Sequence, residues 1–263
     1  GMTLTTMLSL VLSAMMLAAG DAWNYTTGLE DASQQVRASM DRIEYMVSQA
    51  GTYQLTGQPT VPGVAVVERV NGVYRFPEVL VVWSGGRNGG MMNFGTLNRL
   101  PVVNELLIYA PQADDPSRLL EIADPQNTAS IDFFASTFAS TILNIVDAAG
   151  SEKVLLSDRV RVSAMPVLVA TGHTAGNIRF ELFESPSADE LSGITLGSSQ
   201  WYELVWSQGV VCSETGLRQL TVRMEFQLEQ QPPQTLSYDS TTAASSAAIP
   251  FYGSARYLYA YRP

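Results

Sequence analysis

The chain has 263 residues, of which 46% are hydrophobic and 15% charged, and it carries a formal net charge of −10. This length fits one large domain or two small ones, and the composition excludes a chain that is disordered because of its charge. The acidic balance argues against nucleic acid as a partner. Cys212 is the single cysteine, so no disulfide can form within the chain, and we interpret it as a small strand residue.

The first twenty residues contain no charged side chain and no histidine. Residues 2–19 are therefore 18 consecutive uncharged residues, the length at which a membrane-spanning helix becomes a candidate. Their apolar density is lowered by five hydroxyl side chains, at Thr3, Thr5, Thr6, Ser9 and Ser13. We expect residues 1–21 to form the transmembrane or filament-core half of a longer helix.

An apolar stripe with helical spacing follows this segment. Its members recur three or four residues apart, at Leu29, Ala32, Val36, Met40, Ile43 and Val47. The first proline is Pro59, and Gly51 supplies a helix stop. The pattern predicts one helix over residues 2–50, roughly 73 Å long at 1.5 Å per residue. Only its second half, residues 22–50, is amphipathic, and we expect that half to pack on the chain's own β domain.

These residues resemble the processing site of type IV prepilins and of the pseudopilins of type II secretion. A glycine, an apolar residue and Thr-Leu stand at the head of the uncharged helix, as Gly1, Met2, Thr3 and Leu4. The resemblance implies that a prepilin peptidase cuts between Gly1 and Met2 and that the new N-terminus is methylated. The end of the predicted helix, residues 42–51, is similar to minor subunits of the J and W type.

The chain departs from the family pattern at two positions. Met2 stands where the family usually has Phe, and Thr6 stands where it normally carries Glu. In the family that Glu is thought to neutralise the N-terminal amine of a neighbouring subunit inside the apolar filament core. Thr6 has no charge with which to do this. The departure therefore favours a minor or tip subunit over the repeating major one.

Two other interpretations of the N-terminus are open. The apolar run over residues 7–19 could be a secretory signal cleaved after Ala22, which would leave Trp23 as the first mature residue. The chain would then be a secreted or periplasmic β-rich binding domain. Alternatively, Gly1 could be a residue left by cloning, which would remove the glycine as evidence and leave the long helix intact.

From Thr52 onward the pattern changes to short strands. Asn71-Gly72 predicts a hairpin between strands at 64–70 and 73–76. Further strands are predicted at 79–83, 105–109, 118–122, 153–163, 166–170, 178–184, 201–206, 217–228 and 257–261. The alternation over 220–228 is typical of an antiparallel strand with one wet face. Residues 237–248 are rich in Ser, Thr and Ala, which predicts a loop.

One internal helix is predicted over residues 129–149. Apolar residues recur there at helical spacing, with Phe134 and Phe138 expected in the core. Asn127 or Thr128 could cap its start, and Gly150 could close its end.

The search for catalytic and ligand-binding motifs finds no convincing site. The glycine-rich loop at 84–90 lacks the following helix and lysine of a phosphate cradle, so we predict a flexible tip. His173 lies in a predicted turn, and one His with one Cys gives no zinc cluster. The acidic pairs Asp114-Asp115 and Asp189-Glu190 lack the spacing of a calcium loop, and we interpret both as solvated turns.

The sequence thus predicts an α+β protein, with a long N-terminal helix over residues 2–50, a mostly antiparallel β domain over residues 52–263 and one internal helix. We expect a non-enzymatic minor pilin or pseudopilin subunit of a type IV pilus or type II secretion pseudopilus, with no cofactor and no metal. Expected partners are other pilin or pseudopilin subunits, the prepilin peptidase and, before assembly, the inner membrane. Expected locations are that membrane and then a periplasmic or cell-surface filament.

The residues assigned to processing are Gly1 and Met2, and those assigned to assembly are Thr6, Leu29, Val36, Met40, Ile43 and Val47. An extracytoplasmic hydrolase with an unrecognised site is a further alternative, because 25 carboxylates always contain possible acid pairs.

Overall fold

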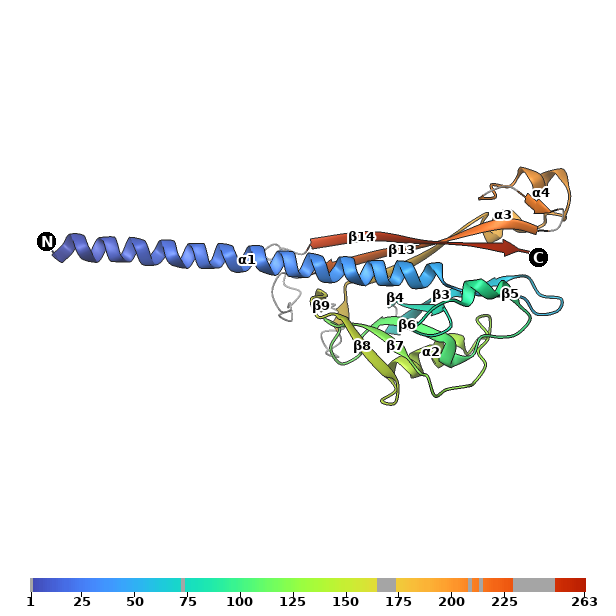
Figure 1. Ribbon diagram of the computed structural model, residues 1–263, viewed down its shortest axis with the longest axis horizontal. Coiled ribbons are helices and arrows are strands. Elements are labelled where there is room, and N and C mark those ends of the chain that lie inside the picture. Colours follow the sequence, from blue (N-terminus) through green and yellow to red (C-terminus); the bar gives the residue numbers. More distant parts are fainter. Residues whose placement is uncertain (1, 72–73, 165–173, 208–209, 213–214, 229–248) are drawn as a thin grey trace.

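The computed structural model describes residues 2–71, 74–164, 174–207, 210–212, 215–228 and 249–263. Its first element is helix α1, Met2–Ser48, which projects far beyond the rest of the molecule (Figure 1). Side chains in α1 are described for residues 12–20, 22–23 and 26–48. Gly1 therefore lies outside the described residues, as do the side chains of Met2 and Thr6.

Two antiparallel sheets form the body of the molecule. The first has the strand order β3-β4-β6-β7-β8, with bounds Val64–Asn71, Tyr74–Trp83, Leu106–Pro111, Leu119–Ala123 and Glu152–Ser157. The second has β11 (Ile178–Ser185) and β14 (Ile249–Tyr261) on either side of β13 (Thr215–Leu228), with the short β12 (Val210–Cys212) also paired to β13. The prediction of a mixed α+β fold with mostly antiparallel strands is confirmed.

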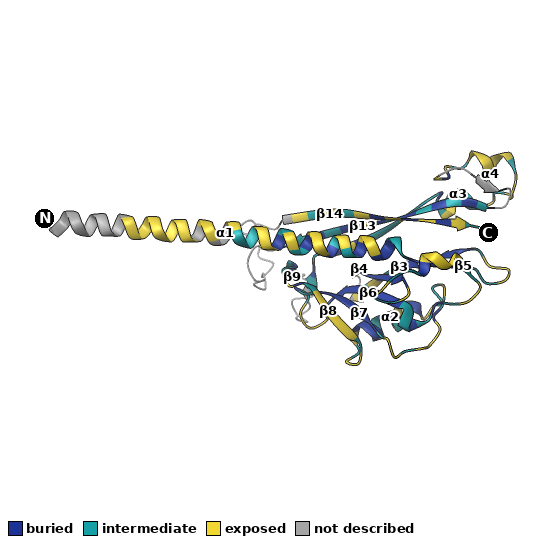
Figure 2. Ribbon diagram, in the orientation of Figure 1, coloured by how far each residue is buried: buried dark blue, intermediate teal, exposed yellow. Residues whose placement is uncertain are grey.

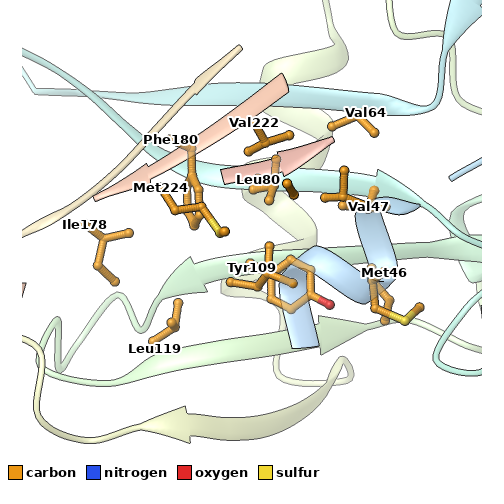
Figure 3. Packing of buried hydrophobic residues seen from close by; sticks show 14 of the residues in the cluster. Met46, Val47, Val64, Leu80, Tyr109, Leu119, Ile178, Phe180, Val222 and Met224 are labelled. Atoms are coloured by element: carbon orange, nitrogen blue, oxygen red, sulfur yellow. The ribbon is translucent and has the colours of Figure 1, made fainter. Parts of the chain in front are cut away.

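Helix α1 lies against both sheets along one side of the molecule. Its second half packs on β14 and β13 of one sheet and on β8, an edge strand of the other. On the opposite side β11 lies directly against β3 and β4. One hydrophobic core fills the space between these elements and contains Val47, Leu80 and Val222 (Figure 3). The helix is thus part of the core that holds the two sheets together.

A second core lies on the other face of the five-stranded sheet. Helix α2, Phe138–Asp147, buries Phe138, Ile142 and Ile145 there, beside Trp83 of β4. Because both faces of this sheet are covered, β6 and β7 are buried at every position. In contrast β13 alternates between buried and half-exposed residues, as its period-2 pattern predicts.

Three smaller units complete the fold. A three-stranded sheet joins β2 (Val61–Pro62), β1 (Thr52–Tyr53) and β5 (Thr96–Leu97), with β1 and β5 parallel. Strands β9 (Val162–Ala164) and β10 (Thr174–Gly176) form a pair. The remaining elements are the 3-10 helices η1 (Met91–Phe94) and η2 (Val103–Glu105) and the short helices α3 (Ala188–Leu191) and α4 (Ser199–Glu203). Helices α3 and α4 lie at the end of the molecule opposite the N-terminus (Figure 1).

The Asn71-Gly72 hairpin is confirmed, because β3 and β4 pair in antiparallel register up to Asn71 and Tyr74. The strands predicted at 73–76 and 79–83 form one continuous strand, β4. The strand predicted over 153–163 is two strands, β8 and β9. The predictions at 166–170 and 237–248 lie outside the described residues.

The prediction of the internal helix was wrong in detail. The internal helix occupies Phe138–Asp147 instead of 129–149, because residues 132–137 form turns in which Asp132 accepts a hydrogen bond from the backbone N–H of Phe134. Phe134 is 70% exposed and is not a core residue. The caps of this helix are Thr137 and Ala148, so Asn127, Thr128 and Gly150 do not cap it.

The strand predicted at 201–206 is also wrong. Residues 199–203 form α4, whose first turn is capped by the Ser198 hydroxyl, which accepts a hydrogen bond from the backbone N–H of Trp201. Trp201 and Trp206 then pack on each other, with ring centroids 4.6 Å apart. The aromatic and β-branched residues of 201–206 favour a strand, but a Ser N-cap starts a helical turn instead.

Candidate functional site

Helix α1 is the candidate functional element, and its predicted apolar stripe is buried in the core. Val36, Ile43 and Val47 are almost completely inaccessible, whereas Met40 and Leu29 are half-buried. Figure 2 shows the change from an exposed rod to a partly buried helix along α1. Val36, Met40, Ile43 and Val47 pack in the core with residues of the chain's own sheets. Their contribution to assembly is therefore to hold α1 on the β domain, because they do not offer a free surface to a partner.

Polar contacts attach the buried side of α1 to β8. The Ser39 hydroxyl donates to the carbonyl oxygen of Gln35 within the helix at 2.7 Å and lies 3.2 Å from the carbonyl oxygen of Leu156. The Ser157 hydroxyl donates to Oε1 of Gln35 at 3.3 Å. Ser39 and Ser157 are both buried, so each hydroxyl needs a partner inside the protein. These contacts attach α1 to the edge strand β8.

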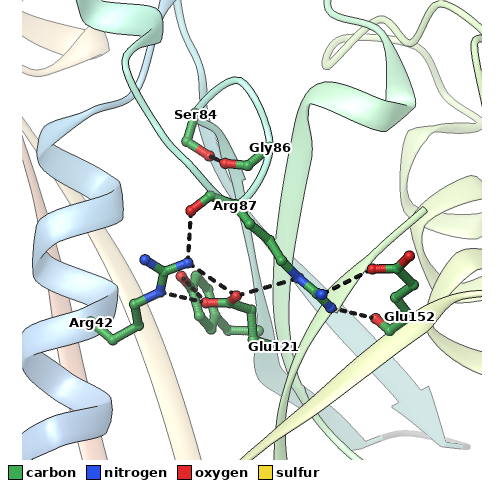
Figure 4. Close-up of polar contacts among 7 residues, drawn as sticks. Arg42, Ser84, Gly86, Arg87, Glu121 and Glu152 are labelled. Carbon is green, nitrogen blue, oxygen red and sulfur yellow. Dashed lines mark hydrogen bonds and ion pairs between the residues drawn. The ribbon is translucent and has the colours of Figure 1, made fainter. Parts of the chain in front are cut away.

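A buried carboxylate makes the strongest polar contact between α1 and the β domain. Arg42 of α1 donates to Glu121 of β7 from Nε to Oε2 at 2.8 Å and from Nη2 to Oε1 at 3.1 Å (Figure 4). The Tyr109 hydroxyl donates to Oε2 at 3.1 Å, and Nε of Arg87 lies 3.8 Å from Oε1. Arg87 in turn pairs with Glu152 at 2.9 Å. We call these five residues the ion-pair network.

Burial and charge in this network shift two pKa values. The hydrogen bond to Glu121 raises the pKa of the Arg42 guanidinium above its usual range. Burial, followed by the negative charge of Glu121, raises the pKa of Tyr109 well above its ordinary value. Both groups therefore keep their protons at physiological pH, and the carboxylate stays surrounded by donors.

The glycine-rich loop at 84–90 packs against the end of α1 and is not a free tip. The carbonyl oxygen of Arg87 accepts a hydrogen bond from Nη2 of Arg42 at 3.0 Å, and the N–H of Met92 donates to the carbonyl oxygen of Gln49 at 3.1 Å. A Cβ on Gly89, which has a φ of +71°, would lie 3.2 Å or less from two atoms of Gln49. Glycine thus lets the loop backbone approach the helix closely, so the loop packs against the last turn of α1.

The N-terminal half of α1 contrasts with this docked half. Every residue from 12 to 20 is exposed, and the large apolar side chains Leu12, Met15, Met16, Leu17 and Trp23 are 54–72% accessible. Exposed apolar side chains that are grouped on one projecting part of a helix are typical of an interaction surface. Within the part of the chain that the structure describes, no helix is both long enough and apolar enough to cross a membrane.

The two acidic pairs lie in separate elements, one between β6 and β7 and the other in α3. His173 lies outside the described residues. Asp115 accepts hydrogen bonds from the N–H and hydroxyl of Ser117, which confirms its place in a turn. Glu190 lies instead in α3, where it and Ser187 form a capping box. Among the described residues, no group of three His, Cys, Asp or Glu side chains could hold a metal ion.

Glu121 was not among the predicted site residues, although the sequence carries a signal for it. Glu121 is the single charged residue within the apolar run of β7, Leu119–Ala123, and a carboxylate inside a buried strand requires a cationic partner. Comparison with known proteins adds nothing to this geometry: no protein-family model, curated protein or solved structure matches the chain.

Proposed function

We propose that this chain is a minor pilin-like or pseudopilin-like subunit of a type IV pilus or a type II secretion pseudopilus, and that it assembles through the N-terminal half of α1. In this proposal the chain is non-enzymatic. The helix anchors it in the inner membrane before assembly and lies in the filament core afterwards, so the β domain faces the periplasm or the cell surface. Its partners are other subunits of the filament and the prepilin peptidase.

The observation that carries the proposal is the division of α1 into two halves of opposite character. Residues 12–20 are uncharged and exposed, whereas residues 32–47 supply a buried stripe and an ion pair to the domain. A helix that is docked at one end and both apolar and exposed at the other can bury its exposed half only against something beyond the described residues. Packing against the helices of neighbouring subunits would bury it.

Three residues of the prepilin-like segment refine the proposal. The prepilin-like motif at Gly1 and Met2 supports processing by a prepilin peptidase. Thr6 cannot pair with the amine of a neighbouring subunit, because a hydroxyl carries no charge to offset a buried ammonium. This supports a position as a minor subunit, where that pairing is not required.

The experiment is mass spectrometry of the N-terminus of the protein purified from the cells that make it. Cleavage by a prepilin peptidase gives a chain that starts at Met2 with a methylated amine. Removal of a signal peptide gives a chain that starts at Trp23, and this result would overturn the proposal in favour of a secreted β-rich domain. Deletion of the prepilin peptidase gene is the matched control, since it should abolish the Met2 start and leave a signal-peptidase product unchanged.

A further inference from the structure

The outward face of the second sheet has the composition of a protein interface. Strands β11, β13 and β14 turn one set of residues to the core and the alternate set to solvent. The outward set includes Phe183, Tyr252 and Leu258, which are 53%, 62% and 43% exposed. It also includes the exposed arginines Arg179, Arg223 and Arg256. Aromatic residues and arginine are enriched in the central parts of protein interfaces.

These six side chains lie close together because of the strand register. Phe183 and Arg256 both stand opposite Thr221 of β13, and Arg179 and Tyr252 both stand opposite Glu225. Arg223 lies opposite Glu181 of β11. The rows from Tyr252 to Leu258 span six residues of β14, roughly 20 Å. We call this surface the outer sheet face.

The outer sheet face is locally basic in an acidic protein. Its three arginines face two glutamates, Glu181 and Glu225. Arg179 and Arg223 share Glu181, the first in contact with it and the second at 3.6 Å. Among the described residues, no carboxylate pairs with Arg256. The face therefore carries one excess positive charge, although the whole chain has a net charge of −10.

An acidic surface of matching length lies on the same chain. The exposed side of α1, opposite its buried stripe, carries Glu30, Asp31, Asp41 and Glu44 with Arg37 as its single exposed cation. Four carboxylates against one guanidinium leave three negative charges, and none of the four pairs with a described cation. The span from Glu30 to Glu44 is 14 residues, roughly 21 Å of helix. We call this side of α1 the acidic ridge.

We infer that the outer sheet face of one copy binds the acidic ridge of a second copy. The two surfaces have opposite charge and nearly equal length, and they lie on opposite sides of the sheet, because α1 packs on its core side. One copy cannot bring them together within itself. A contact between two different surfaces is heterologous, and here it joins neighbouring copies of the minor subunit. The inference rests on the proposed function and names a partner surface that does not involve Thr6.

The first experiment is zero-length cross-linking of the full chain in detergent. Arg256→Lys keeps the positive charge and adds an amine that a carbodiimide joins to a carboxylate in contact with it. Isotopically heavy and light chains are mixed before cross-linking, and the expected product joins position 256 of one chain to Asp41 or Glu44 of the other. Lys153 is the chain's only natural lysine and lies exposed on β8, so it serves as the internal control that should not form this link. Absence of the heavy–light product would overturn the inference.

The second experiment is charge reversal, measured by sedimentation of the same detergent-solubilised chain. We expect Arg256→Glu or Glu44→Lys alone to weaken self-association by at least about tenfold, and both changes in one chain to restore it. Lys153→Glu is the matched control and should leave association unchanged. If both single variants associate as the wild type does, or the wild type does not associate, the inference fails. The proposed function is tested separately by Leu17→Asp, which leaves both of these surfaces intact.

Discussion

Arg42 of α1 and Glu121 of β7 form a two-point ion pair whose carboxylate is buried and whose guanidinium is about one third exposed. The residues are 79 positions apart in the chain. Two parallel hydrogen bonds fix the distance between the partners as well as the angle at which they meet. The pair therefore sets both the position and the rotation of the rod on the five-stranded sheet.

We expect Arg42→Ala to destabilise the protein by about 2–3 kcal/mol, because it leaves a buried carboxylate without its main partner. The loss is at the lower end of the range for buried pairs because Arg87 remains 3.8 Å from the carboxylate. Urea unfolding measures it. Arg37→Ala, on the exposed side of the same helix, is the control and should change the free energy of unfolding by less than about 0.5 kcal/mol. Equal losses in the two variants would contradict a special role for the pair.

Burial of the apolar stripe of α1 leads to a second prediction about the stability of the protein. Ile43 is completely buried between the two sheets, so Ile43→Ala should cost about 2–4 kcal/mol through lost burial and the cavity that remains. Tyr45 lies two residues further on and is 51% exposed, and Tyr45→Ala should have a small effect. Thermal unfolding followed by circular dichroism compares the two. A large loss for Tyr45→Ala with none for Ile43→Ala would mean that the helix is rotated relative to the structure.

Local patterns predicted those parts of the fold that depend on neighbouring residues. The spacing of Val36, Ile43 and Val47 identified the buried side of α1, and Asn71-Gly72 located a hairpin. The partner of Arg42 was not predictable from spacing, because the ion pair depends on how β7 is placed by the whole sheet. The same holds for the glycine-rich loop at 84–90, whose packing depends on the end of α1 lying next to it.

The failures around α2 and α4 have a common physical cause. In both segments a short polar side chain bonds to nearby backbone and fixes a turn, as Asp132 does before α2 and Ser198 does before α4. Such local bonds compete with regular helix or strand and override apolar periodicity. The periodicity thus predicted a helix that is too long in the first case and a strand in the second.

Glu78 makes stability depend on pH. Burial raises its pKa to about 7, although Arg69 lies 3.2 Å away and acts in the opposite direction. The folded protein therefore binds a proton between about pH 4.5 and 7 that the unfolded chain releases, so the free energy of unfolding falls as the pH rises through this window. Glu78→Gln should remove this fall and stabilise the protein by about 2–3 kcal/mol at pH 8, with little effect at pH 4.

Urea unfolding of the wild type and Glu78→Gln at several pH values between 4 and 8 checks this. Glu68→Gln is the matched control, because Glu68 lies on the same hairpin with its side chain 44% exposed. That variant should keep the pH dependence of the wild type. If Glu78→Gln also keeps it, another group is responsible.

Gly216 at the start of β13 lies against the indole ring of Trp206. A Cβ at this position would come within 2.4 Å of three ring atoms, so Gly216→Ala must displace the tryptophan pair. We expect a loss of at least about 2 kcal/mol and a red-shifted tryptophan emission as water reaches the rings. Gly150→Ala is the control, since a Cβ there meets nothing within 4 Å. An unchanged emission spectrum in Gly216→Ala would contradict the close packing.

A substitution in the exposed half of α1 should impair assembly without lowering the stability of the fold. Leu17 is 70% exposed on the part of the rod that projects from the β domain, so Leu17→Asp should change the free energy of unfolding by less than about 0.5 kcal/mol. A carboxylate buried among apolar helices of neighbouring subunits would instead cost several kcal/mol, so the same variant should be lost from the sedimentable filament fraction of cells. Leu17→Met keeps the size and apolar character and should remain in that fraction. If Leu17→Asp sediments with filaments as well as Leu17→Met does, the projecting half of α1 is not the assembly surface.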